Sequence, residues 1–301
     1  MLVMSGGLSA QQDPLFSQYT FNRLLINPAF AGNRNVVSSN VGYRQNFAGL
    51  ENAAENLHLT VHAPIQSKFM AVGLKVIHDQ IGVTSNTYIS GIYAYHLGFG
   101  EGRLSLGLEA GLVNSRVNFN DLIRRDDFDM AIPDGTESKV IPDFGFGAFY
   151  DQEQFYVGLS ARHLTQGSLD FTEDFNRPNR AELRRHYIIT AGYIFDVAPN
   201  IELQPAVLAR HVYNAPFLMD FSAIATFSKL ITIGGSYRSN QALVGFLGLR
   251  IKENFNIGYA YDYIMSDLAN YTNGSHEIML NYNVNLISPA ERKIIDPRYY
   301  Y

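Results

Sequence analysis

The pattern of hydrophobic and polar positions is clearest between Leu230 and Leu286, where the residues alternate with a period of two. In Phe255–Met265, for example, one face carries aromatic and aliphatic side chains while the other carries Asn, Gly, Ala and Asp. This alternation is typical of β-strands, because successive side chains point to opposite faces. The predicted strands of this region are Leu230–Arg238, Ala242–Lys252, Phe255–Met265 and His276–Leu286.

Two fold classes contain strands of this kind. A transmembrane barrel strand turns its apolar face to lipid and its polar face to the lumen. A β-sandwich strand turns one face to the core and the other to water. The polar faces here are rich in Gly, Ser and Asn rather than Lys and Glu, and the apolar faces carry several tyrosines. A crowded lumen and an aromatic girdle have these compositions, so the pattern favours the barrel.

The rest of the chain continues the alternation. We expect further strands near residues 36–48, 54–63, 69–79, 83–98, 102–118, 142–151, 154–164, 185–196, 200–212 and 216–228. The long connections follow odd-numbered strands: Phe119–Ile141, Leu164–Arg184 and Ser266–Ser275. Outer-membrane barrels alternate short periplasmic turns with long extracellular loops in this way. We therefore predict an all-β fold, a transmembrane antiparallel β-barrel of about 14 strands within residues 33–286. Pro205 cannot donate to a ladder, which predicts a bulge or a rim position in its strand.

The segments outside the predicted barrel differ in composition. Residues 1–10 are weakly apolar and end in Leu-Ser-Ala, like the end of a secretory signal, or else form a disordered N-terminus. Residues 11–32 hold two Asx-Pro pairs with apolar side chains between them, and we expect a clasp or plug in the periplasmic end of the barrel. Residues 287–301 follow the last strand as a periplasmic tail or as a signal for barrel assembly.

Composition and charge narrow the function. The 301-residue chain contains no Cys, which excludes disulfides, thiolate metal sites and Cys nucleophiles. Its formal net charge of -5 and the absence of a basic stripe argue against nucleic-acid binding. Charged residues make up 17% of the chain, fewer than the roughly 25% of soluble domains. The low charge fits strands that expose one face to lipid.

Short motifs along the chain resemble those of the PorP/SprF family, outer-membrane barrels associated with type IX secretion and gliding motility in Bacteroidetes. The N-terminal motifs are Gln12-Asp13-Pro14, Phe16-Ser17-Gln18-Tyr19 and Asn27-Pro28-Ala29-Phe30-Ala31-Gly32. Later motifs are Tyr43-Arg44-Gln45, Pro142-Asp143-Phe144, Tyr261-Asp262-Tyr263, Gly274-Ser275-His276-Glu277 and Pro297-Arg298-Tyr299. A departure is Asn46-Phe47, where many relatives have Gln-Trp, and it changes an interfacial aromatic.

The sequence offers no catalytic constellation. It contains no GxSxG elbow, no HExxH motif and no phosphate-binding glycine loop, so we expect no enzymatic activity and no cofactor. The carboxylates of Asp126, Asp127, Asp129 and Asp134 lack the spacing of an EF-hand. We interpret them as a solvated loop surface, with a calcium site as the alternative.

One group of charges follows from the expected strand register. If the tyrosines of the last strands face lipid, then Arg238, Arg250, Asp262 and Glu277 face the lumen. Opposite charges on neighbouring strands pair with each other. We predict a lumen ion-pair cluster that fills and rigidifies the barrel, and a charged constriction that selects a solute is the alternative.

The resemblance implies a barrel that supports export, or retention at the cell surface, of a partner with a type-B C-terminal domain, such as a gliding adhesin. It also implies contacts with other type IX secretion components. The first long loop carries apolar side chains that suit a protein contact. These predicted partner-contact residues are Leu122, Ile123, Phe128, Met130 and Ile132. The alternatives are an outer-membrane channel for small or apolar solutes and a soluble, lectin-like all-β protein.

Overall fold

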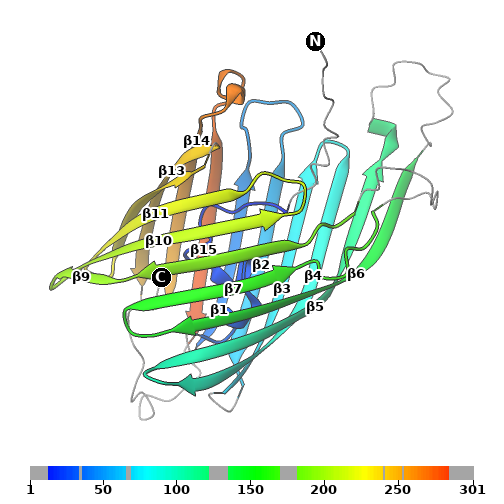
Figure 1. Cartoon of the computed structure of the whole chain (residues 1–301). Coiled ribbons are helices and arrows are strands. Elements are labelled where there is room, and N and C mark those ends of the chain that lie inside the picture. The colour runs from blue at the N-terminus through cyan, green and yellow to red at the C-terminus, as the bar shows by residue number, and fades with distance from the viewer. Residues whose placement is uncertain are drawn as a thin grey trace.

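The computed structural model describes residues 13–33, 36–65, 69–121, 135–169, 182–239, 241–252 and 254–284. In these residues an antiparallel sheet curls into a barrel, with β1 to β4 nearly upright and β7 to β11 crossing them at a slant (Figure 1). Its strands are β1 Val37–Gln45, β2 Glu55–Pro64, β3 Met70–Ile81, β4 Thr84–Phe99, β5 Gly102–Asn118, β6 Thr136–Asp151, β7 Phe155–Arg162, β8 His186–Tyr193, β9 Phe195–Ala198, β10 Ile201–Val212, β11 Leu218–Phe227, β12 Ile231–Arg238, β13 Ala242–Lys252, β14 Phe255–Ile264 and β15 Ser275–Val284.

The strands form a closed ring. β15 pairs with β1, and β10 pairs with both β8 and β11. β8 and β9 form one strand interrupted at Ile194, because both pair with β10 in the same register, which shifts only at Ile201 near the end of β9. The interruption lies next to Pro205 of β10, which cannot donate to the ladder. The wall is therefore a closed 14-strand barrel, and the predicted fold class is confirmed.

Side chains alternate between the outside of the wall and the lumen. On β14 and β15 the outward side chains include Tyr259, Tyr263 and Ile278, which are 38%, 59% and 51% exposed. The inward side chains include Asp262 and Glu277, both 0% exposed. The apolar face therefore surrounds the barrel, and the polar face lines a filled lumen, as in barrels whose outer surface contacts lipid.

The two ends of the barrel differ in their connections. Residues 46–54, 119–135, 163–185 and 265–274 connect strands at one end, called here the long-loop end, and shorter turns connect them at the short-turn end. β6 begins at Thr136 rather than near residue 142, so the first long loop is shorter than expected. β7 pairs with β6 only from Phe146 on. Pro142 therefore lies on an edge, where proline is tolerated.

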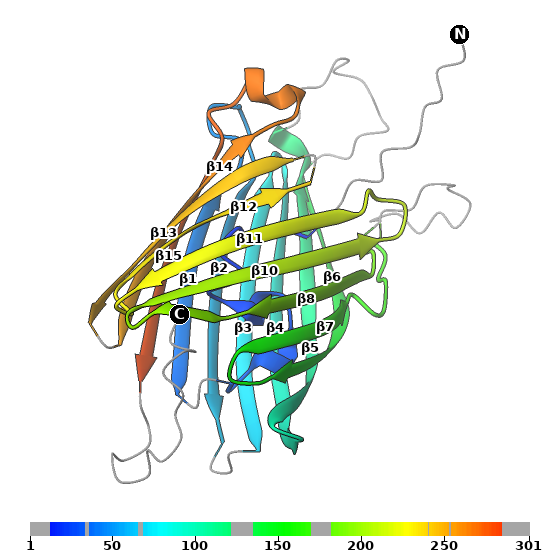
Figure 2. The ribbon, with the colours of Figure 1, turned by 60° about the vertical axis from the view of Figure 1, so that its left-hand side comes forward.

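Residues 13–33, called here the plug, lie inside the barrel. They include the 3₁₀ helices η1 Arg23–Leu25 and η2 Pro28–Phe30, and the strands surround this dark blue segment in two views (Figures 1 and 2). Two more 3₁₀ helices, η3 Phe119–Asp121 and η4 Asp267–Asn270, belong to the long loops. Among the described residues, no helix is long and apolar enough to cross a membrane.

The plug runs nearly the whole length of the lumen. Asp13 contacts His163 and His186, which lie at the long-loop end. The backbone N–H of Gly32 donates to His62, and the carbonyl of Asn33 accepts from Arg103, near the short-turn end. The sequence predicted a clasp at the periplasmic end alone. In the structure the segment extends through the lumen, because its residues form polar contacts at both ends of the barrel.

Candidate functional site

Apolar side chains of the plug pack against different sectors of the wall. Phe16 packs against β3 to β6, and Leu24 packs against β3 and β4. Tyr19 contacts β8, β10 and β11, whereas Phe21 contacts β11 and β13 to β15. Phe30 packs against β6 and β7. Because each large side chain is buried in a different direction, the hydrophobic contacts hold the plug near the barrel axis and fix its rotation.

The Asn-Pro-Ala motif docks on a strip of the wall that is formed by glycines. Asn27 Nδ2 donates to the carbonyls of Ala148 (3.0 Å) and Leu159 (3.1 Å), which are register partners on β6 and β7. A Cβ on Gly147 would overlap the side chain of Asn27, and a Cβ on Gly107 would overlap the backbone of η2. These paired glycines of β5 and β6 therefore allow the plug backbone to approach the wall.

Nearer the long-loop end, the plug docks on a buried ionic cluster. Ser17 Oγ donates to Asp262 (2.8 Å), and the backbone N–H of Ser17 donates to Glu277 (2.7 Å). The backbone N–H of Gln18 also donates to Glu277, at 3.1 Å. Arg44 bridges both carboxylates, with N–O distances of 2.7 Å to Asp262 and 3.0 Å to Glu277. Buried charges are tolerated when they are paired and hydrogen-bonded in this way.

The cluster continues around the wall to β11. Arg238 lies 2.9 Å from Asp262 and 3.1 Å from Asp220. Its Nη2 also donates to Ser17 Oγ at 3.1 Å. Strand pairing supports the cluster, because Arg44 is the register partner of Glu277 and Arg238 is the register partner of Asp220. Three of the four predicted lumen charges thus lie together, and the plug is part of the cluster.

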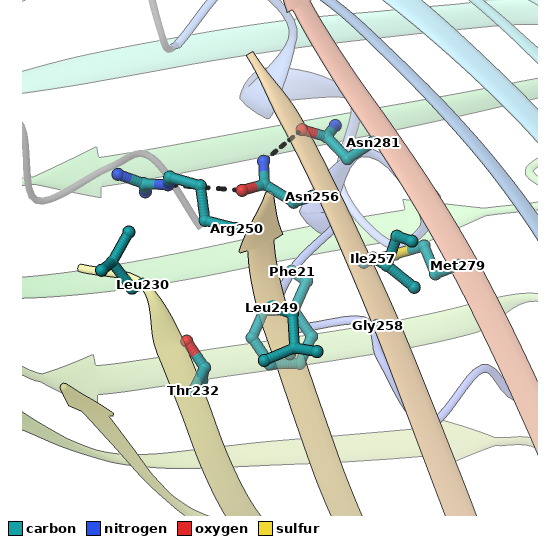
Figure 3. A pocket seen from close by; sticks show the side chains of 11 residues that line it. Phe21, Leu230, Thr232, Leu249, Arg250, Asn256, Ile257, Gly258, Met279 and Asn281 are labelled. Atoms are coloured by element: carbon teal, nitrogen blue, oxygen red, sulfur yellow. Dashed lines mark hydrogen bonds between the residues drawn. The ribbon is translucent and has the colours of Figure 1, made fainter. Parts of the chain in front are cut away.

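The fourth predicted residue, Arg250, lies apart from this cluster. Its Nε donates to Asn256 (3.3 Å), whose Nδ2 donates to Asn281 (3.2 Å), so the three side chains form a chain across β13, β14 and β15 (Figure 3). Asn256 precedes Asp262 by six residues, roughly 20 Å along a strand. Arg250 therefore lies on the predicted face of its strand, but at a different height along the barrel axis from the other three predicted charges.

A second polar cluster holds the start of the plug. Asp13 lies 2.6 Å from Arg162 and 2.7 Å from His163, which lies 2.9 Å from Asp143 on its other side. Burial alone would raise the pKa of Asp13, but Arg162 and two histidines hold the pKa well below its usual range. Burial alone would lower the pKa of His163, but the neighbouring carboxylates raise it to about 9. His163 is therefore protonated near neutral pH.

Sequence reasoning missed the residues that connect the plug to the wall. Arg44, Asp13 and Ser17 belong to the motifs quoted above, but the residues around them in the sequence do not indicate which parts of the wall they contact. Ser17 and Glu277 are 260 residues apart. Arg162 ends the strand β7 and His163 follows it, and their role depends on where the plug emerges from the lumen. The available signal was weak: a cation on the polar face of the first predicted strand.

Several predicted residues lie outside the described part of the chain. These are the partner-contact residues Leu122, Ile123, Phe128, Met130 and Ile132, the alternative calcium ligands of the same loop, the N-terminal residues 1–10 and the C-terminal residues 287–301. Within the described ranges, no group of three or more His, Asp or Glu side chains is placed to hold a metal ion.

Two cavities of the described structure border the docked plug. A cavity of about 30 Å³ lies beside Phe21 and the glycines Gly248 and Gly258, bordered by the Arg250–Asn256–Asn281 chain (Figure 3). A larger cavity of about 210 Å³ lies at the long-loop end next to Asp13. The arrangement can hold a segment of polypeptide firmly in the lumen.

Solved structures similar to this chain share its fold. The toluene transporter TbuX of Ralstonia pickettii has a TM-score of 0.54 and 10% identity, covering 87% of this chain and 92% of that chain. A FadL homologue of Pseudomonas aeruginosa has a TM-score of 0.50 and 10% identity, covering 93% and 96% respectively. At such identity the likeness shows the architecture alone, that of outer-membrane barrels. No curated protein sequence matches the chain.

The sequence itself matches a family model over almost its whole length. The model describes the type IX secretion system membrane protein PorP/SprF and matches residues 8–282. This family is a component of a secretion system and not an enzyme family. The barrel is located in the outer membrane. In barrels of this kind the long loops are extracellular. The chain belongs to the PorP/SprF family of type IX secretion system membrane proteins.

Proposed function

We propose that this barrel supports the export or surface attachment of a secreted partner protein, which it engages through the partner's type-B C-terminal domain. A gliding adhesin is an example of such a partner. The observation that carries the proposal is the docked plug: residues 13–33 fill the lumen and are bound at both of its ends. A barrel whose lumen is occupied by its own chain has its loops free for recognition of a protein.

The proposed contact surface is the first long loop, residues 119–135. Its apolar side chains at Leu122, Ile123, Phe128, Met130 and Ile132 would provide the desolvated anchors that dominate protein interfaces. Aromatic and Met side chains are enriched at such contacts. The assignment of this loop rests on the sequence.

The test is a detergent pull-down of the tagged protein from native outer membranes, with bound proteins identified by mass spectrometry. Recovery of a large surface protein through its C-terminal domain is the expected result. The variant Phe128→Ser with Met130→Ser should abolish recovery. The matched control is Leu268→Ser with Tyr271→Ser, which removes side chains that are 45% and 71% exposed in another loop at the same end. Recovery that survives the first variant, or fails equally in both, would contradict the assignment of the loop.

The alternative is a channel for small or apolar solutes, and the fold likeness to a toluene transporter favours it. A channel would require the plug to move, because its side chains fill the lumen. Planar-bilayer conductance or uptake of toluene by liposomes that contain the pure barrel would support this function. The absence of both, together with recovery of a surface protein, would favour the secretion function.

A further inference from the structure

The cavity at the long-loop end has the chemistry of a binding site. It measures about 210 Å³, and β3, β4, the connection between β7 and β8, and Asp13 of the plug line it. It lies at the long-loop end, which is the extracellular end in outer-membrane barrels. Tyr88 of β4 also packs in the cluster around Phe16 of the plug, but plug docking and the proposed partner loop do not account for Asp79 of β3 or Asn86 of β4.

Asp79 on β3 is a buried carboxylate that lacks a counter-charge. It is 4% exposed and accepts a hydrogen bond from the amide of Asn56. No Lys, Arg or His of the described residues forms an ion pair with it, whereas Asp13 pairs with Arg162 and Glu182 lies 3.9 Å from Arg184. An unpaired buried carboxylate is costly, and a cation placed beside it offsets this cost.

Two further inward-facing groups complete the β3 and β4 side of the cavity. Asn86 is the register partner of Asp79, so the two side chains are neighbours across the strands. The Oδ1 atom of Asn86 is buried and accepts no hydrogen bond within the described structure. Tyr88 follows on the same face and is 8% exposed. The cavity thus offers a carboxylate without a counter-charge, an amide oxygen without a hydrogen bond and an aromatic ring whose neighbour is His163.

We propose that this cavity binds a primary ammonium group, with Asp79 as its counter-ion, Asn86 as a hydrogen-bond acceptor and Tyr88 as an aromatic wall. An ammonium group carries one positive charge and three donors, which match one carboxylate and further acceptors. The face of an aromatic ring also attracts a cation. The cationic side chains that line the cavity already pair with carboxylates, His163 with Asp13 and Asp143 and Arg184 with Glu182, so an anion would be left against Asp79. The described residues offer no set of ligands for a metal ion. This site does not depend on the proposed secretion function.

The experiment is isothermal titration calorimetry on the purified, detergent-solubilised barrel. The probes are cadaverine, a free amine, and lysine blocked as its N-acetyl methylamide, which represents a protein side chain. Both should bind, whereas the same lysine derivative acetylated on its side chain should not. Tighter binding of the lysine derivative would identify a protein side chain as the natural ligand, and tighter binding of cadaverine would identify a free amine.

Variants test the assigned residues. Asp79→Asn keeps the shape and the acceptor for Asn56 and should weaken binding about tenfold or more, because hydrogen bonds to a charged group are stronger than those to a neutral one. Asn86→Asp should tighten binding, since it adds a second carboxylate. The control is Asp151→Asn, a buried carboxylate paired with Arg103 near the other end. The proposal is overturned if neither amine binds the wild-type protein, or if Asp79→Asn and Asn86→Asp both bind as the wild type does.

Discussion

Replacing Asp262 with Asn removes the charge at the centre of the plug-docking cluster. The side chain of Asp262 is 1% exposed and neutralises two guanidinium groups, at 2.7 Å from Arg44 and 2.9 Å from Arg238. It also accepts the hydroxyl hydrogen bond of Ser17. Asn preserves the shape and one acceptor oxygen, so the change isolates the effect of charge.

The magnitude follows from the burial of the cluster. Breaking a buried ion pair costs about 3–5 kcal/mol, because the remaining charge stays buried without its partner. Asp220 and Glu277 still neutralise part of the positive charge. We therefore expect a loss near the lower limit, about 3 kcal/mol of the free energy of unfolding. The double variant Asp262→Asn with Arg44→Gln should lose less than the sum of the two single variants, by about 1 kcal/mol or more.

Urea titration of the barrel in detergent micelles, followed by circular dichroism, measures these free energies. Tyrosine fluorescence provides a second probe, since the chain contains 19 Tyr and no Trp. The control is Glu101→Gln in an exposed turn, which should change stability by less than about 0.5 kcal/mol. A loss for Asp262→Asn no larger than that of the control would refute the reasoning, as would strict additivity in the double variant.

Three further predictions concern the docked plug, and limited proteolysis or hydrogen exchange of residues 13–33 measures each of them. Leu24→Ala removes a side chain that is 0% exposed and should weaken docking by about 2–5 kcal/mol, seen as faster exchange of the plug. Gly147→Val should expose the plug to protease because the new side chain overlaps Asn27. Unchanged protection would contradict the docking of Asn27 against Gly147. His163 has its pKa raised from 6.5 to about 9, so its contribution to docking is complete below pH 6.5 and is lost as pH rises through 9. His163→Gln should remove this pH dependence, and its persistence would assign it to another group.

The wall could be predicted from the sequence because each strand carries its own signal. Period-two alternation reports which face of a strand is buried, and it located Arg238, Asp262 and Glu277 on the lumen face before their partners were known. Alternation does not report height along the barrel axis, which depends on register and shear. Arg250 was misplaced for this reason, since its register partner is Asn256.

The plug could not be predicted in the same way. Residues 13–33 do not alternate, and their contacts are scattered over strands from β1 to β15. The meeting of Arg44 with Glu277 requires the closing pair of β1 and β15, a contact between the first and last strands of the chain. Local sequence contains no information on such a contact. Motif resemblance indicated that Asn27 and Ser17 matter, and the structure supplies their partners.

The position of the plug ahead of β1 has a consequence for the order of barrel assembly. Residues 13–33 precede every wall strand in the chain. Because β15 is synthesised after the other wall strands, its pairing with β1 is the last strand pairing that can form. A barrel that closed first would have to admit the plug lengthwise, past the ionic cluster around Asp262. The direct route is for the wall to fold around the plug, with Arg44 and Glu277 meeting over Ser17 where β1 pairs with β15. The plug is then a template for closure, and damage to it would appear first as a defect of insertion into the membrane.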